Sequence, residues 1–187
     1  MSWMLLGSGR IIDPDNRASL ASMTLAEIAH GLRHTIRWNG QSRVPISVLA
    51  HSLACATAAA RDRRAPRVVL ACLYHDVAEC VLGDMRATLK RLPGLLHFRL
   101  LDAEYTNTLL QAHAPEALGA YATGAHVHYD RAALNCERLN FFPPIQDARD
   151  WPPEPPLASD CYQLDAAPDE WIQASDFWRR EAQGHVE

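Results

Sequence analysis

The residues best suited to chemistry are histidines and carboxylates spread along the middle of the chain. His51 is followed by the adjacent pair His75 and Asp76, and then by Asp130. Imidazole nitrogens and carboxylate oxygens in such a set suit a divalent first-row metal ion with positions open for water and substrate. Glu79 follows His75 by four residues, so on one helix it would lie on the same face and offer a carboxylate for proton transfer.

Each of these residues alone has an ordinary structural explanation. A single histidine in an apolar helix is more often a hydrogen-bonded core residue than a ligand, and an isolated carboxylate is often a surface group or a helix cap. The order of the whole set, with every member on a predicted helix, favours the metal site.

These residues have to be positioned by helices, because period-two alternation and β-branched runs are almost absent. Thr24 and Glu27 form a capping-box pattern, Ser47 suits an N-cap, and Pro66 suits the first turn of a helix. The sequence predicts helices over residues 24–34, 47–61, 66–80, 84–91 and 98–113, one or two over 115–140, and a terminal helix over 168–182. We therefore predict an all-α helical bundle.

The segment 142–168 differs from the rest because it is rich in proline, and we predict an extended wrap there and no second domain. The terminal helix carries Trp171, Phe177 and Trp178, which we expect to form a core-facing stripe. A length of 187 residues is typical of one domain, so we predict a single domain over residues 1–187 whose core spans about residues 20–140.

Composition excludes several classes of protein. The net charge of −4, from 18 basic and 22 acidic residues, argues against a nucleic-acid binder. No run of about 18 apolar residues is present, so we expect no membrane span. The five cysteines are odd in number and form no CxxC pair, which argues against a disulfide framework. Buried free thiols in a reducing cytoplasm are the expected explanation.

Two longer motifs surround the histidines. Residues 47–52 read SVLAHS, and residues 73–84 read LYHDVAECVLGD, with Lys90 six positions further on. Together with Arg37-Trp38 and Asp130-Arg131, they resemble the HD-domain metal-dependent phosphohydrolases. The resemblance is greatest to the branch of bacterial 5′-deoxynucleotidases and phage deoxyadenosine-triphosphate triphosphohydrolases. It covers about residues 10–140, because the proline-rich tail is not diagnostic.

The resemblance assigns roles to individual residues. It implies metal ligation by His51, His75, Asp76 and Asp130, activation of the attacking water by Glu79, and a further site carboxylate at Asp84. It also implies that Arg37 holds the substrate phosphate, that Trp38 borders sugar or base, and that Lys90 reaches further phosphates. A core position for Trp38 and a solvated surface position for Lys90 remain open alternatives.

The function implied is removal of phosphate or triphosphate from a small-molecule (deoxy)nucleotide by water attack at the 5′ α-phosphorus. The resemblance also implies one divalent ion, which could be Mn, Co, Zn, Mg or Fe, and a homo-oligomer. Alternatives are an HD hydrolase of another phosphate ester, such as a cyclic nucleotide or an alarmone, and a nucleotide-binding protein without activity. The presence of Glu79 and Asp84 favours an enzyme, because a degenerate site commonly loses such groups.

Overall fold

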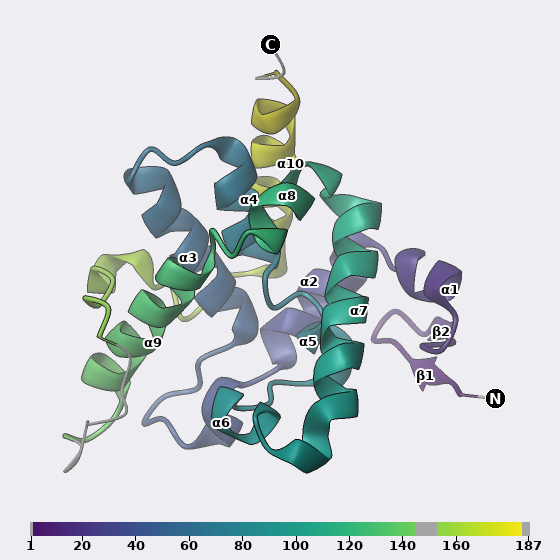
Figure 1. The fold of residues 1–187 in the computed structure, drawn as a ribbon, viewed down its shortest axis with the longest axis horizontal. Coiled ribbons are helices and arrows are strands. Elements are labelled where there is room, and N and C mark those ends of the chain that lie inside the picture. Colours follow the sequence, from purple (N-terminus) through teal and green to yellow (C-terminus); the bar gives the residue numbers. More distant parts are fainter. Residues whose placement is uncertain (1, 145–152, 185–187) are drawn as a thin grey trace.

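The structure, a computed structural model, describes residues 2–144 and 153–184. Helices dominate it, and the strands in these ranges are β1 (Met4–Leu5) and β2 (Ile11–Ile12), which pair antiparallel as a small hairpin. The all-α prediction is confirmed (Figure 1). The longer helices are α2 (Leu25–His34), α3 (Val48–Arg61), α4 (Pro66–Tyr74), α7 (Leu96–His113), α9 (Val127–Phe141) and α10 (Pro168–Gly184). Shorter turns of helix join them: α1 (Arg17–Ala21), η1 (Arg37–Gly40), α5 (Glu79–Leu82), α6 (Ala87–Lys90), η2 (Pro93–Leu95), η3 (Pro115–Ala117), α8 (Leu118–Ala122) and η4 (Ser159–Cys161).

Local capping signals decide where α2, α3 and α4 begin. The Thr24 side chain accepts the backbone N–H of Glu27 while the Glu27 carboxylate accepts that of Thr24, so the predicted capping box is present. Ser47 caps α3 by accepting from the backbone N–H of Ala50, and Pro66 occupies the first turn of α4. These starts are confirmed because each depends on a hydrogen bond or a fixed φ within a few residues.

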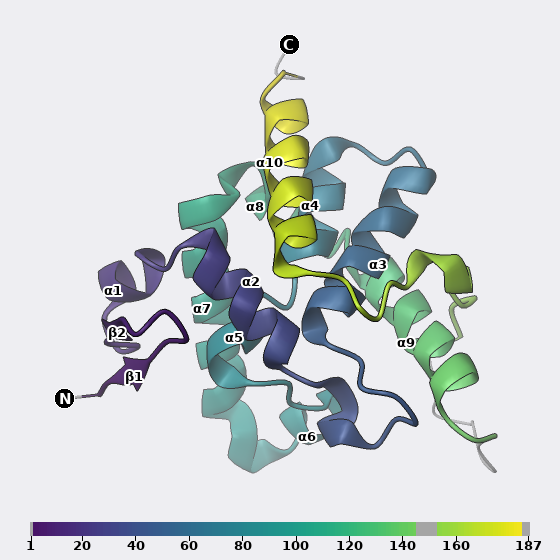
Figure 2. The ribbon, with the colours of Figure 1, turned by 180° about the vertical axis from the view of Figure 1, so that it is seen from behind.

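The core lies where α3 and α4 pack side by side, with α9 and α2 against α3 and α10 across α4 and α2 (Figures 1 and 2). Trp171 of α10 is fully buried against Tyr74 of α4, with ring centroids 4.8 Å apart. The Tyr74 hydroxyl also lies 2.6 Å from Ser175 Oγ. The terminal helix is therefore part of the core that supports α4.

The predicted aromatic stripe on the terminal helix is wrong at Phe177. Trp171 is buried and Trp178 packs partly against the core, but Phe177 is 47% exposed. Six residues at about 100° each place Phe177 far around the helix from Trp171, whereas seven residues bring Trp178 back to the same face.

Two predicted helices are shorter than expected. The helix predicted over 66–80 ends at Tyr74, because the chain tightens into turns in which the N–H groups of Val77 and Glu79 reach carbonyls three residues back. The helix predicted over 84–91 spans only Ala87–Lys90. Gly83, at φ +76°, changes the direction of the chain between the helix that ends at Tyr74 and the one that begins at Ala87. Because the first helix ends at Tyr74, His75 and Glu79 do not share one helix face.

The proline-rich segment runs beside α9 where it is described. Leu157 N–H donates to the Ala132 carbonyl at 3.1 Å, and Asn135 Nδ2 donates to the Glu154 carbonyl. Residues 145–152 of the predicted wrap lie outside the described residues. Among the described helices, none has both the length and the apolar character needed to cross a membrane.

Glu27 ties the N-terminal hairpin to α2 and should make stability depend on acid pH. Arg10 Nε and Nη2 each donate to the Glu27 carboxylate at 2.9 Å. Burial alone would raise the pKa of Glu27, but hydrogen bonds from Arg10, Ser8 and Thr24 outweigh it and lower the pKa from 4.5 to about 2. Because the folded pKa lies below the unfolded one, this stabilisation is present above pH 4.5 and is lost as the pH falls toward 2.

We expect Glu27→Gln to lower the free energy of unfolding at pH 7 by about 1–3 kcal/mol and to flatten its acid dependence. Urea unfolding at pH 7 and at pH 3 measures both. Glu104→Gln is the control, because its pair with Arg17 is exposed and should contribute below about 1 kcal/mol. Parallel pH curves for Glu27→Gln and wild type would contradict the assignment.

Candidate metal centre

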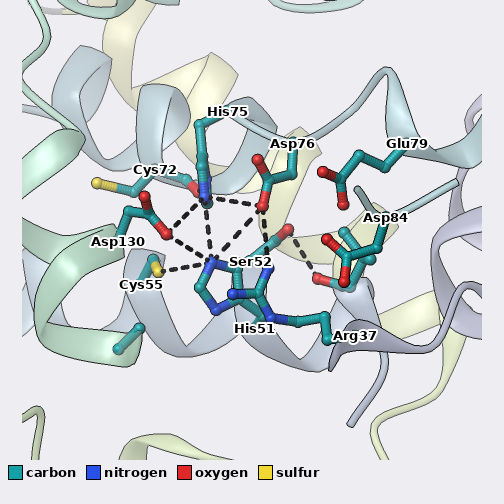
Figure 3. A network of polar contacts seen from close by, with 12 residues as sticks. Arg37, His51, Ser52, Cys55, Cys72, His75, Asp76, Glu79, Asp84 and Asp130 are labelled. Carbon is teal, nitrogen blue, oxygen red and sulfur yellow. Dashed lines mark hydrogen bonds and ion pairs between the residues drawn. The ribbon is translucent and has the colours of Figure 1, made fainter. Parts of the chain in front are cut away.

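Four predicted ligands converge although they come from three parts of the chain. His51 lies in the first turns of α3, His75 caps the end of α4, Asp76 follows in the turn, and Asp130 lies in the first turn of α9. The packing of α3 against α4 and α9 brings these positions together. Figure 3 shows their side chains pointing toward one another.

The donor atoms lie close enough together to share one metal ion. His51 Nε2 lies 3.2 Å from both His75 Nε2 and Asp130 Oδ1, and 3.6 Å from Asp76 Oδ2. His75 Nε2 lies 3.2 Å from Asp76 Oδ2 and 3.7 Å from Asp130 Oδ1. Donors held about 2.1 Å from a shared ion at angles of about 90–110° are themselves about 3.0–3.4 Å apart. The residues therefore fit a divalent metal ion.

The outer nitrogens of both imidazoles are already used, which fixes the orientation of each ring. His75 Nδ1 lies 2.8 Å from the Cys72 carbonyl, which can only accept, so Nδ1 carries the proton. His51 Nδ1 lies 2.8 Å from Oε1 of Glu137. Both Nε2 atoms therefore face the carboxylates with the arrangement that metal-binding histidines adopt.

The electrostatics of the site favour a positive charge at this point. Burial lowers the pKa of His75, but Asp76 and Asp130 outweigh it and raise the pKa well above its ordinary value of 6.5. Burial and Arg37 lower the pKa of His51, but Glu137 and Asp130 raise it overall. A divalent cation at this point would contact the carboxylates of Asp76 and Asp130 and the Nε2 atoms of both histidines.

A sulfur atom also belongs to this group, and sequence reasoning missed it. The donor atoms of His51, Cys55 and His75 all lie within 4.8 Å of one another, so these three residues could hold a metal ion. The available signal was the spacing of His51 and Cys55, four residues apart on one helix face.

Arg37 and Trp38 lie beside the metal centre, on η1. The Arg37 guanidinium is buried, with Nη1 3.3 Å from Asp76 Oδ2 and Nε 3.1 Å from Glu137 Oε1. Trp38 has φ +61°, a left-handed conformation that costs energy for a bulky residue. Its backbone N–H donates to Asp84 Oδ2 at 2.9 Å, so Asp84 holds the turn that presents Arg37.

Glu137 connects these residues and was also missed. Its fully buried carboxylate accepts from Trp38 Nε1 at 2.6 Å and from the Tyr162 hydroxyl at 2.6 Å, in addition to Arg37 and His51. Burial would raise the pKa of Glu137, but the charges of Arg37 and His51 lower it to about 2. The one sequence feature that pointed to Glu137 was its position seven residues after Asp130, which places both residues on one face of α9.

Glu79 and Lys90 form a separate pair at the edge of the site. Lys90 Nζ lies 3.2 Å from Glu79 Oε1 and 2.9 Å from Asp102 Oδ2. Burial, followed by the charges of Asp76 and Asp84, raises the pKa of Glu79 well above 4.5 despite Lys90. The ammonium expected to reach phosphates is therefore engaged by two carboxylates.

One cavity joins most of the predicted site residues. It has a volume of about 520 Å³. Its wall includes Arg37, Trp38, Asp76, Glu79, Asp84 and Asp130. Lys90 also lines it, together with Arg86 and Arg91, which sequence reasoning did not single out. The Arg86 guanidinium lies 5.4 Å from the centre of the Trp38 ring, so this indole forms a wall of the cavity.

Comparison with known proteins adds little about activity. The chain matches no protein-family model. It is 34% identical over 123 residues to an uncharacterized protein of Rhodobacter capsulatus. The match covers 64% of this chain and 62% of that protein, so the chain spans less than two thirds of the length of this relative.

Proposed function

We propose that this protein is a metal-dependent phosphohydrolase of the HD-domain type that acts on a nucleotide. The observation that carries the proposal is the convergence of the four donors of His51, His75, Asp76 and Asp130 within 3.7 Å of their neighbours, with both Nδ1 atoms engaged outward. A divalent ion held there would polarise a phosphate oxygen and lower the pKa of water. The motifs shared with HD-domain phosphohydrolases support the same assignment.

Glu79 is placed to handle a proton. Burial and the charges of Asp76 and Asp84 raise the pKa of this carboxyl group, so its carboxylate is a stronger base than an exposed one. Lys90 fixes Oε1, while Oε2 is buried without a hydrogen-bond partner among the described residues. That oxygen is the atom we propose as the proton acceptor.

Arg37 supplies fixed positive charge for a phosphate. Asp76 and Glu137 hold its guanidinium beside the metal ligands, so little side-chain freedom is lost when an anion binds. A guanidinium fork fits phosphate oxygens at two points, and neutralising charge on the phosphoryl group lowers the barrier to attack.

The cavity wall favours a substrate with more than one phosphate. Arg37 and Lys90 already face carboxylates, but Arg86 and Arg91 add two more basic side chains to the wall of the same cavity. Arg86 Nε is buried without a hydrogen-bond partner in the described part of the chain. We therefore propose a deoxynucleoside triphosphate as substrate, ahead of a 5′-monophosphate. Water attack at the α-phosphorus would break the bond to the 5′-oxygen, so the nucleoside would leave and triphosphate would be the other product. The deoxyribose preference depends on the family resemblance alone.

Product analysis by chromatography tests the proposal. The protein is incubated with Mn²⁺ or Co²⁺ and each deoxynucleoside mono- and triphosphate, with cyclic nucleotides and an alarmone added to the panel. We expect nucleoside and triphosphate from at least one triphosphate, and none with His75→Ala. Turnover of a cyclic nucleotide or alarmone alone would move the activity to another phosphate ester. Nucleotide binding without turnover of any compound would favour a binding protein.

A further inference from the structure

The proposed metal centre has a buried sulfur atom, that of Cys55, next to its nitrogen and oxygen donors. Cys55 lies one helical turn after His51, so both side chains leave α3 on the same face. Its sulfur is buried and lies 3.7 Å from Nε2 of His51, the nitrogen that faces the other donors. Figure 3 shows this contact on the same side of the ring as Asp130.

We infer that Cys55 is a ligand of the bound ion, which gives the proposed metal centre a sulfur donor. A zinc-like ion holds sulfur at about 2.3 Å and imidazole nitrogen at about 2.0–2.1 Å. At angles of about 90–110°, these bonds separate sulfur from nitrogen by about 3.1–3.6 Å, and Cys55 Sγ lies 3.7 Å from His51 Nε2, just beyond that range. The inference rests on the metal centre of the proposed function and adds to it the class of ion.

A sulfur ligand changes which ions the site selects. Thiolates favour borderline and soft ions such as Zn²⁺ and Co²⁺, whereas carboxylates and water suit Mg²⁺ and Mn²⁺. Coordination replaces the S–H bond with a metal–sulfur bond, and the thiol proton passes to solvent. The site would therefore prefer Co²⁺ and Zn²⁺ over Mn²⁺ and Mg²⁺ more strongly than its two nitrogens and two carboxylates alone would.

A second buried thiol provides a matched control. Cys72 contributes its backbone carbonyl to His75, a contact that survives replacement of the side chain. Its sulfur points away from the converging nitrogens in Figure 3 and is absent from the His51, Cys55 and His75 group. Both cysteines are buried helical residues, so their alanine variants lose similar packing.

The absorption spectrum of the Co²⁺-loaded wild-type protein tests the inference without turnover. Sulfur bound to Co²⁺ gives an intense charge-transfer band in the near ultraviolet, while nitrogen and oxygen donors give only weaker visible bands. We expect the charge-transfer band in wild type and in Cys72→Ala, and its loss in Cys55→Ala and Cys55→Ser. We also expect titration to show a fall of at least about tenfold in the preference for Co²⁺ over Mn²⁺ in both Cys55 variants.

The outcomes separate this inference from the proposed function. Visible Co²⁺ bands with no charge-transfer band in wild type would overturn the sulfur ligand and leave the phosphohydrolase proposal standing. A charge-transfer band that persists in Cys55→Ser would also overturn it. Failure of wild type to bind any divalent ion would overturn both. If Cys55→Ala does not fold, the wild-type spectrum and Cys55→Ser still decide the matter.

Discussion

Replacing Asp76 by alanine is expected to remove the proposed metal ion and the proposed hydrolytic activity together while leaving the helical fold in place. Asp76 Oδ2 lies 3.2 Å from His75 Nε2 and 3.3 Å from Arg37 Nη1, so the variant removes a proposed metal donor and one partner of Arg37, which we propose to bind phosphate. Asp76 lies in the turn after α4, so no long helix depends on its side chain. We expect activity to fall by at least about 1000-fold, which corresponds to about 4 kcal/mol of transition-state stabilisation.

Metal content, turnover and far-ultraviolet circular dichroism measured on one preparation check this result. Asp160→Ala is the matched control, because this exposed carboxylate pairs with Arg61 at the C-terminal end of α3, ten residues after His51, and should leave all three readings unchanged. Full activity in Asp76→Ala would reject the metal assignment. Loss of activity with full metal content would instead place Asp76 in substrate binding through Arg37.

The sequence was most informative where structure depends on near neighbours. The starts of α2, α3 and α4 follow from Thr24, Ser47 and Pro66, each of which acts within its own first turn. The buried histidine His51 was also identified, because a histidine in an apolar run is conspicuous. These features need no knowledge of how distant segments pack.

The parts that could not be predicted depend on packing between segments. The break after Tyr74 follows continuous helix-forming residues, and only the folded chain shows that it turns Glu79 away from His75 toward Lys90. The residues around Glu137 come from η1, α3 and the proline-rich segment, so no spacing in the sequence predicts that they lie together. A buried hydrogen-bond network of this kind is a tertiary feature.

Glu137 is expected to have the largest structural effect of any single residue of the site. Its carboxylate is fully buried and accepts from His51, Arg37, Trp38 and Tyr162. It therefore joins a proposed metal ligand, His51, to Arg37, the residue proposed to bind phosphate. Glu137→Ala leaves the buried Arg37 with Asp76 alone, and breaking a buried ion pair from one side costs about 3–5 kcal/mol. We expect a loss of that size in the free energy of unfolding.

Metal affinity should fall with it, because His51 Nδ1 loses the acceptor that keeps Nε2 free to bind. Titration with Co²⁺ should show affinity weakened about 10–100-fold in Glu137→Ala. The Co²⁺ affinity of Glu137→Gln should lie between those of Glu137→Ala and wild type. The amide oxygen can still accept hydrogen bonds, but the NH₂ group replaces the second acceptor with a donor that faces other donors. Tyr162→Phe removes a single hydrogen-bond donor and should lower the free energy of unfolding by only about 1 kcal/mol. This order of effects follows from the number of hydrogen-bond donors that each variant leaves without an acceptor. Equal Co²⁺ affinity in wild type, Glu137→Ala, Glu137→Gln and Tyr162→Phe would show that Glu137 stabilises the fold without positioning His51.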